Sequence, residues 1–486
     1  MVHHPDIFRP EGTLATNEIK NNNIEAIKKK PDTVFLYFTV VTAVLLMITG
    51  GTTLVWQSPA IIKFKSNDTD VNPLGKPIET IEISILAGVP MMMSLIGGLV
   101  LPKLGDLIGR KKALQCLGLA MLLCLTGTAF SNRFYLFVIL ISCSCIIYNG
   151  IWGLLPIYLI EISEDHNRAK FGCLLAVCMP LGQLYCYVVG SVFSIRYFTL
   201  LNALPLIPFL LLFLFAPESP VYSLLIGKQD ECMETLKKLR SNKSKTEIQD
   251  DFDKIKIALE EQSKNTNFSL ITIFNTKAGR LGYFLGALPM IVQFFSGVPT
   301  VMSLMAPTFN EIGIISGNTI AIVVGAVKVF IYLFTSLVIE RTGRRPLLLI
   351  SSIGAGLAVS LVGIYFYVKE INSTALDQLQ FLPVLAIIAY VVLYSIGLGP
   401  IPVAVMSEMF PADLRPIGNG CITTSGGIIL SVVTFSFPLL VEHIGTHWCM
   451  FIFALNCFLG ALVIYFIMPE TKGKSVVEIQ KILKEF

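Results

Sequence analysis

Long apolar stretches recur along almost the whole length of this 486-residue chain. A helix needs about 20 mostly apolar residues to cross the hydrocarbon core of a lipid bilayer. Only 14% of the residues are charged, and the mean hydropathy of +0.71 is far above that of a soluble domain. We therefore predict an all-α membrane protein with twelve transmembrane helices in a lipid bilayer. The twelve windows lie near residues 33–57, 81–101, 113–130, 134–158, 171–193, 198–216, 281–306, 318–339, 347–368, 382–405, 417–440 and 448–467.

The distribution of lysine and arginine predicts the orientation of these helices. An even number of spans places both termini on one side of the membrane, and most of the basic residues in short loops lie on that same side. Basic loops are retained in the cytoplasm, so we expect both termini to be cytoplasmic. About thirty polar residues precede the first window without a signal-peptide pattern, so that helix itself is expected to target the chain.

One long polar insert divides the chain into two sets of six spans. Residues 217–280 contain charged residues at helical spacing, which predicts solvated cytoplasmic helices. The expected organisation is a cytoplasmic tail at 1–32, a six-helix bundle at 33–216, this helical linker at 217–280, a second six-helix bundle at 281–468 and a cytoplasmic tail at 469–486.

Several classes of function find no support in the sequence. The net charge of +4 is small and no basic run is interleaved with aromatic residues, which argues against a nucleic-acid partner. No spacing of cysteine and histidine is typical of a metal site, and no nucleophile is paired with a base. We therefore expect no catalytic residue, no metal and no cofactor. The sequence leaves the oligomeric state open.

Two loop motifs occur once in each half. The motifs "GDLIGRKK" (105–112) and "ERTGRRP" (340–346) follow the second and eighth windows, and each has an acidic residue three positions before a Gly-Arg pair. The motifs "PIYLIEISEDHNRAKFG" (156–172) and "PIPVAVMSEMFPADLRP" (400–416) follow the fourth and tenth windows, and each has a glutamate seven residues before an arginine. Such repeats indicate a duplicated six-helix unit. Parallel halves of this kind form transporters with a site at their interface.

The repeated loops place glutamates beside arginines at the cytoplasmic mouth. Each exposed ion pair contributes only about 0–1 kcal/mol, so we interpret these residues as a network that joins the halves when the inside is closed and opens an inner gate when it breaks. Positive-inside anchoring alone accounts for the arginines but not for the repeated glutamates. The predicted gate residues are Asp106, Arg110, Glu161, Arg168, Glu218, Glu340, Arg344, Glu408, Arg415 and Glu470.

In these motifs the chain resembles the sugar porter branch of the major facilitator superfamily, and within it the insect facilitated trehalose transporter-like proteins. The resemblance also includes "PESP" (217–220), "GPIP" (399–402) and "PETKGKS" (469–475), so it extends over nearly the whole chain. It implies the major facilitator fold, in which two six-helix bundles rock against each other and carry a sugar such as trehalose or a hexose.

Small and polar side chains follow one face of three windows, as expected for the wall of a cavity. The alternative is close packing by small residues, which is common between membrane helices. The predicted substrate-binding residues are Gln293, Ser296, Gly297, Thr300, Lys328, Tyr332 and Thr424.

The same windows depart from the pattern that the resemblance implies. In "QFFSGVPT" (293–300), Phe294 stands in place of a family glutamine and Pro299 in place of an asparagine. Sugar hydroxyls that are buried without a hydrogen bond cost about 1–3 kcal/mol each. We therefore expect a pocket whose polar contacts differ from those of the family, although the gate motifs match the family pattern. Further family side chains are replaced at Ala176, Lys328, Val403 and Gly426.

Lys328 is the most unusual of these residues, because about ten residues separate it from either end of its window. At about 1.5 Å per residue this is roughly 15 Å, farther than a lysine stem reaches. A lysine that faces lipid at this depth costs at least about 2.5–3.5 kcal/mol. We therefore expect Lys328 to face the interior of the bundle, with water, backbone carbonyls or the substrate as its partners.

The predicted function is facilitative transport of a solute, most simply a sugar, across the plasma membrane by alternating access. No Asp or Glu lies deep in any window and no "GxxxxGK[ST]" loop is present, which argues against a carboxylate proton relay and against ATP as the energy source. Lys328 and the lost amides leave a carrier of another organic solute, including an anionic one, as an alternative. A sensor with a transporter fold is a second alternative, and the short segment at 469–486 argues against a signalling tail.

Four N-glycosylation sequons lie in predicted loops. Asn67 and Asn372 are expected on the outer side, where glycosylation takes place. Asn242 and Asn267 are expected on the cytoplasmic side, where it does not.

Overall fold

The structure is a computed structural model. It describes residues 32–69, 71–164, 166–264, 274–310, 315–371, 381–410, 414–470, 472 and 478. Within these residues the regular elements are α-helices and one short 3-10 helix, and eleven helices are long and apolar enough to span a membrane. The prediction of an all-α protein that crosses the membrane many times is therefore confirmed. Asn267 and Asn372 lie outside the described residues.

The helices follow the predicted windows closely. The first half contains α2 (Val34–Val55), α3 (Gln57–Phe64), α4 (Thr80–Val100), α5 (Pro102–Ile108), α6 (Arg110–Ala129), α7 (Phe134–Ile162), α8 (Arg168–Val192), α9 (Ile195–Ala203), α10 (Leu206–Leu212) and η1 (Phe213–Phe215). The segment that follows contains α11 (Pro220–Leu225), α12 (Gln229–Leu239) and α13 (Lys245–Lys264). The second half contains α15 (Lys277–Phe295), α16 (Val298–Ser303), α17 (Met305–Phe309), α18 (Gly317–Thr342), α19 (Arg344–Glu370), α20 (Leu382–Ile396), α21 (Ile401–Glu408), α22 (Arg415–Ile444) and α23 (Thr446–Ile467).

The predicted window at 281–306 contains a broken helix, and it is the predicted window that has no counterpart among the eleven candidate spans of the described residues. Its residues belong to α15, α16 and α17 in succession. Between α15 and α16, Gly297 has φ +79°, a left-handed conformation that glycine adopts without steric strain. Pro299 lies in the first turn of α16, where its missing N–H is tolerated. The seventh crossing is therefore made by the 19-residue helix α15 and the two short helices α16 and α17.

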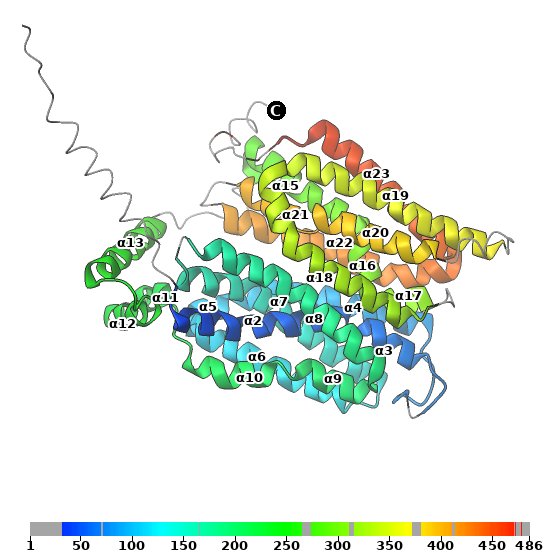
Figure 1. The fold of residues 1–486 in the computed structure, drawn as a ribbon, viewed down its shortest axis with the longest axis horizontal. Coiled ribbons are helices and arrows are strands. Elements are labelled where there is room, and N and C mark those ends of the chain that lie inside the picture. The colour runs from blue at the N-terminus through cyan, green and yellow to red at the C-terminus, as the bar shows by residue number, and fades with distance from the viewer. Residues whose placement is uncertain are drawn as a thin grey trace, which may run out of the picture.

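The two halves lie side by side, with the linker helices at one end (Figure 1). Helices α2 to α10 form one group, and α15 to α23 form the other. Across the interface, α4 packs against α22 and α8 packs against α18. Helices α11 to α13 protrude beyond the bundle near α5, and we call this the motif end. The opposite end contains α3 and α17.

Two glycines allow α2 and α8 to approach each other closely within the first half. A Cβ atom on Gly51 would lie 2.2 Å from the carbonyl oxygen of Met179, and a Cβ on Gly182 would lie 2.0 Å from that of Ile48. Helices in lipid associate through close van der Waals packing, because lipid tails are as apolar as the side chains. The contact between α2 and α8 therefore depends on the absence of a side chain at both positions.

Replacing Gly182 with alanine should destabilise the protein. The new methyl group meets a backbone carbonyl, which cannot rotate away, so we expect a loss of about 1–3 kcal/mol and a lower Tm of the detergent-solubilised protein. Gly172→Ala is the matched control on the same helix, since a Cβ there would meet nothing within 4 Å. Equal Tm values for the two variants would contradict the packing role of Gly182.

Candidate functional site

The first repeated loop brings an arginine and two carboxylates together. Gly109, with φ +99°, ends α5 and directly precedes Arg110, the first residue of α6. The Nε of Arg110 donates to Glu161 Oε2 at 3.0 Å, and its Nη1 donates to the carbonyl oxygen of Gly105 at 2.9 Å. Nη1 also lies 3.0 Å from Asp106 Oδ1. Arg110 is 6% exposed, so these contacts replace most of its hydration.

Glu218, from the end of the sixth span, joins the same cluster. Its Oε1 accepts hydrogen bonds from the backbone N–H groups of Lys111 and Ser219, each at 2.9 Å. The first N–H groups of a helix lack intrahelical partners and lie at the positive end of the helix dipole, so they favour a carboxylate. The hydroxyl of Ser219 donates to Glu161, which connects Glu218 with the Arg110 pair.

The second half contains an equivalent cluster. Gly343 has φ +106° and precedes Arg344, the first residue of α19. The backbone N–H groups of Arg344 and Arg345 donate to Glu470 at 3.0 and 3.1 Å. The Nη2 of Arg344 lies 3.4 Å from Glu408 Oε1. The sequence repeat is therefore also a repeat of contacts.

These contacts join residues within one half. Glu218 and Glu470 accept from the first N–H groups of α6 and α19, and Glu161 and Glu408 pair with the arginines that begin those helices. Ion pairs between the halves stay a prediction for a form in which the motif end is closed. Of the other predicted gate residues, Arg168 is exposed and Arg415 is half-buried, while the side chain of Glu340 lies outside the described part of the chain.

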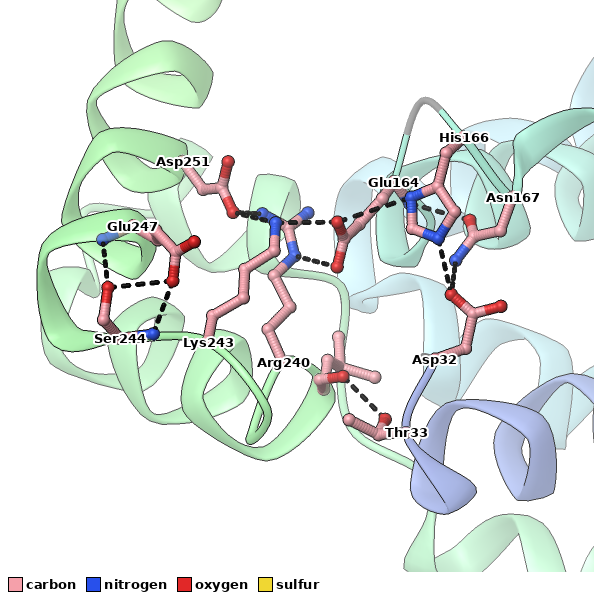
Figure 2. A network of polar contacts seen from close by, with 11 residues as sticks. Asp32, Thr33, Glu164, His166, Asn167, Arg240, Lys243, Ser244, Glu247 and Asp251 are labelled. Carbon is pink, nitrogen blue, oxygen red and sulfur yellow. Dashed lines mark hydrogen bonds and ion pairs between the residues drawn. The ribbon is translucent and has the colours of Figure 1, made fainter. Parts of the chain in front are cut away.

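A polar network that the sequence did not predict joins the linker helices to the first half (Figure 2). Arg240, at the end of α12, lies with Nη1 2.5 Å from Asp251 Oδ2 and with Nε 3.7 Å from Glu164 Oε1. Lys243 Nζ lies 2.7 Å from Glu164 Oε2 and 3.0 Å from Asp251 Oδ2. Glu164 belongs to the loop between α7 and α8, so two cations hold that loop against α13.

The start of α2 is tied to the same loop (Figure 2). Asp32 Oδ1 lies 2.7 Å from His166 Nε2 and accepts a hydrogen bond from Asn167 Nδ2 at 3.0 Å, and the Thr33 hydroxyl donates to the end of α12 at 2.7 Å. Burial by itself raises the pKa of Asp32, but hydrogen bonds from Asn167, Tyr37 and His166 outweigh it and lower the pKa below its ordinary value. The charged carboxylate therefore contributes to holding α2, the loop and the linker together.

The predicted substrate-binding residues of the broken span lie against α20. Gln293 Nε2 donates to the hydroxyl of Tyr394 at 2.9 Å and to the carbonyl oxygen of Gly399 at 3.1 Å. The Ser296 hydroxyl donates to the carbonyl of Gln293 at 2.6 Å, just before the break at Gly297. Gln293 thus connects α15 with the loop between α20 and α21, and its amide is satisfied by protein groups.

Two predicted threonines lie at α22. The hydroxyls of Thr300 and Thr434 are 3.0 Å apart, which connects α16 with α22. Thr424 donates to the carbonyl of Gly420 in its own helix at 2.8 Å. Within the described residues, no group of histidine, cysteine and carboxylate side chains is arranged to hold a metal ion.

Lys328 and Tyr332 of α18 lie at the interface with the first half. Lys328 is 7% exposed, and its Nζ donates to Oε1 of Gln183 on α8 at 2.9 Å. The same Nζ lies 5.8 Å from the centre of the Tyr332 ring. Gln183 was not predicted from the sequence, although it is the one glutamine of its window.

Comparison with known proteins decides the family. The family model described as "Sugar (and other) transporter" matches residues 34–483. The chain belongs to this family. It is therefore a membrane transporter with alternating access, and the family predicted from the loop motifs is confirmed.

Curated relatives of this transporter include facilitated trehalose transporters of insects. The facilitated trehalose transporter Tret1-2 homolog of Drosophila simulans is 28% identical over 90% of this chain and 88% of its own length. The facilitated trehalose transporter Tret1 of Polypedilum vanderplanki is 26% identical over 94% of this chain and 90% of its own.

Solved structures show the same fold. The inward open conformation of the xylose transporter XylE from E. coli superposes with a TM-score of 0.77 at 20% identity, over 92% of this chain and 99% of XylE. The XylE structure bound to 6-bromo-6-deoxy-D-glucose superposes with a TM-score of 0.71, over 93% of this chain and 100% of XylE. The major facilitator fold with two six-helix bundles is thereby confirmed.

Replacing Arg240 with glutamine should loosen the linker of this transporter. Glu164 and Asp251 then lose a partly buried cation, and we expect a loss of about 1–3 kcal/mol, seen as a lower Tm and as faster proteolysis between α12 and α13. Lys238→Gln is the control, because the Lys238–Glu234 pair is 59% and 65% exposed and contributes little. The proposed role of Arg240 is wrong if both variants behave like the unmodified protein.

Proposed function

We propose that this transporter moves a sugar such as trehalose or a hexose down its concentration gradient. The proposal rests on the paired architecture, in which matched clusters of arginine and glutamate lie at one end of the two bundles. The curated relatives of the chain, which are facilitated trehalose transporters, support it. The clusters support a carrier with two rigid halves, because each holds the helix ends of its own half together.

The proposed sugar contacts are the predicted wall residues. Several of their polar atoms already have protein partners, as the Gln293 amide nitrogen has in Tyr394 and the Thr300 hydroxyl has in Thr434. A sugar hydroxyl that enters exchanges one partner for another, so no buried donor is left without an acceptor. The proposed residues are Gln293, Ser296, Gly297, Thr300, Lys328, Tyr332 and Thr424.

We further propose that the motif end faces the cytoplasm and that the protein lies in the plasma membrane with both termini inside. The bias of lysine and arginine toward the loops at this end supports the orientation. The opposite end, which contains the loop between α3 and α4 and helix α17, is then the outer end. Asn67 lies exposed in that loop, where a glycan can be attached.

The contacts between the halves support a form that is closed at the outer end. A Cβ on Gly88 of α4 would lie 2.4 Å from the Cβ of Phe435, and one on Gly427 of α22 would lie 2.3 Å from Leu95 Cδ2. These close approaches leave no room for a solute to pass between α4 and α22. We therefore propose that the structure represents an inward-facing form.

We propose the predicted boundaries as the domains of the carrier: tail 1–32, bundle 33–216, linker 217–280, bundle 281–468 and tail 469–486. The contacts of Arg240 and Lys243 with Glu164 support a linker that moves with the first bundle.

A carrier of an organic anion is the second candidate. One observation favours it, namely the buried ammonium group of Lys328 at the interface of the halves. A carboxylate of the solute would form a stronger hydrogen bond with this group than a sugar hydroxyl does.

Transport should be measurable with the purified protein in liposomes. We expect counterflow of labelled trehalose or glucose without a proton gradient and without ATP. Citrate serves as the anionic comparison, and its preferential uptake would favour the second candidate. A folded protein that shows no counterflow with any hexose or disaccharide would exclude the sugar proposal.

The proposed orientation predicts which sequon receives a glycan. In insect cells, Asn67→Gln should increase the electrophoretic mobility of the protein and remove its sensitivity to an N-glycosidase at that site. Asn242→Gln, in the linker, is the matched control and should change neither. A glycan on Asn242 would overturn the proposed orientation.

A further inference from the structure

Within the described residues, three buried hydrogen bonds cross between the halves toward the outer end. The hydroxyl of Tyr187 donates to the carbonyl oxygen of Met302 at 2.6 Å, and the N–H of Ala306 donates to Ser58 Oγ at 2.9 Å. The third is the bond from Lys328 Nζ to Gln183 Oε1. It is the one among them that includes a charged group.

The Lys328–Gln183 bond lies in the interior of the bundle, well below its outer surface. Lys328 is eleven residues after Gly317, where α18 begins, which corresponds to roughly 16 Å along the helix. Gln183 is nine residues before the end of α8 at Val192. Gly325 allows α18 to approach α8, since a Cβ there would lie 3.2 Å from the Tyr187 ring. Separation of α8 from α18 at the outer end therefore breaks this bond.

The partner of Lys328 is neutral, and this makes the bond suitable for repeated breaking. Within the part of the chain that the structure describes, no ion pair includes Lys328, and Gln183 is 4% exposed. A buried cation is costly unless it is hydrogen-bonded, so the amide is needed while the interface is closed. An amide oxygen holds an ammonium group less strongly than a carboxylate does, so the halves can still separate.

Once the halves separate, the ammonium group of Lys328 needs another oxygen. Water enters an open cavity, and so does the solute, whose hydroxyl or carboxylate oxygens are acceptors for an ammonium group. Gln183 and the solute then compete for the same donor. Release of the solute toward the motif end is favoured when the ammonium group of Lys328 again donates to Gln183.

On the basis of the proposed transport function, we propose that Gln183 and Lys328 form a latch that holds the outer end closed, and that the opened carrier presents Lys328 to an oxygen of the solute. Gln183 is a positioning residue in this scheme, and Lys328 is a residue that determines which solutes bind.

Hydrogen–deuterium exchange of the full-length protein in lipid nanodiscs tests the latch without any solute. Gln183→Leu leaves a buried cation without an acceptor, so exchange in 184–192 and 298–309 should become faster by about threefold or more. Gln183→Glu supplies a carboxylate and should slow it. Asn202→Leu is the control, because it removes a buried amide that contacts Cys186 in the same half. Faster exchange in Gln183→Glu, or equal acceleration in Asn202→Leu, would overturn the latch.

A double variant distinguishes a direct contact from general loss of packing. Lys328→Met with Gln183→Leu replaces both partners by apolar groups, so it should exchange more slowly than Gln183→Leu alone. Residues in contact show such non-additive effects, whereas independent sites add. Additive acceleration in the double variant would contradict the proposed pair.

Transport kinetics test the second part of the proposal. With trehalose, glucose and citrate as probes on the outside, Gln183→Leu should lower the KM of the transported solute because the open form is more populated. Lys328→Met should raise it because the solute loses a donor. A rise of KM in both variants would overturn the competition. If none of the three probes is transported, the proposed function fails, and the exchange measurements still decide the latch.

Discussion

The hydrocarbon core of the membrane is a poor solvent for charge, and this constraint determines where the charged contacts described above lie. Charged side chains are stable at the ends of spans or inside the bundle with a partner. Arg110 and Arg344 begin helices, and their partners Glu161 and Glu408 end others, so both clusters lie where lipid gives way to water. Lys328 instead lies inside the bundle and has a partner, Gln183, from the other half.

The spans could be predicted because apolar length is a local property of the chain. The window at 448–467 corresponds to α23 (Thr446–Ile467), and that at 134–158 corresponds to α7 (Phe134–Ile162). The window at 281–306 was predicted as one helix and is broken. The stretch "QFFSGVPT" contains the glycine and the proline of the break. The apolar pattern of the sequence does not reveal, however, that Gly297 has a positive φ and interrupts the helix.

The sites were only partly predictable, because the partners of a polar side chain depend on tertiary packing. The repeat predicted Arg110, Glu161, Arg344 and Glu408 as gate residues, and the structure shows that they lie in two matched clusters, while their role in gating stays a prediction. The sequence does not show which helix ends lie next to each other in the fold. The pairing of these residues within each half and the contact of Arg240 with Glu164 therefore could not be predicted. Gln183 was missed for the same reason, since 145 residues separate it from Lys328.

The two ends of the carrier are held by different kinds of interaction, and the difference has a mechanical consequence. At the motif end, the charged clusters lie within each half, so they stiffen the halves without resisting their separation. Toward the opposite end, which contains α3 and α17, hydrogen bonds such as Tyr187 to Met302 cross the interface and involve a neutral acceptor. A neutral bond of this kind contributes only about 0.5–1.5 kcal/mol net, and the bond from Lys328 to Gln183 about 1.5–3 kcal/mol, so opening this end exchanges a few modest contacts for contacts with water. A carrier needs two forms of similar free energy, and hydrogen bonds to neutral acceptors between stiff halves satisfy that need better than buried ion pairs would.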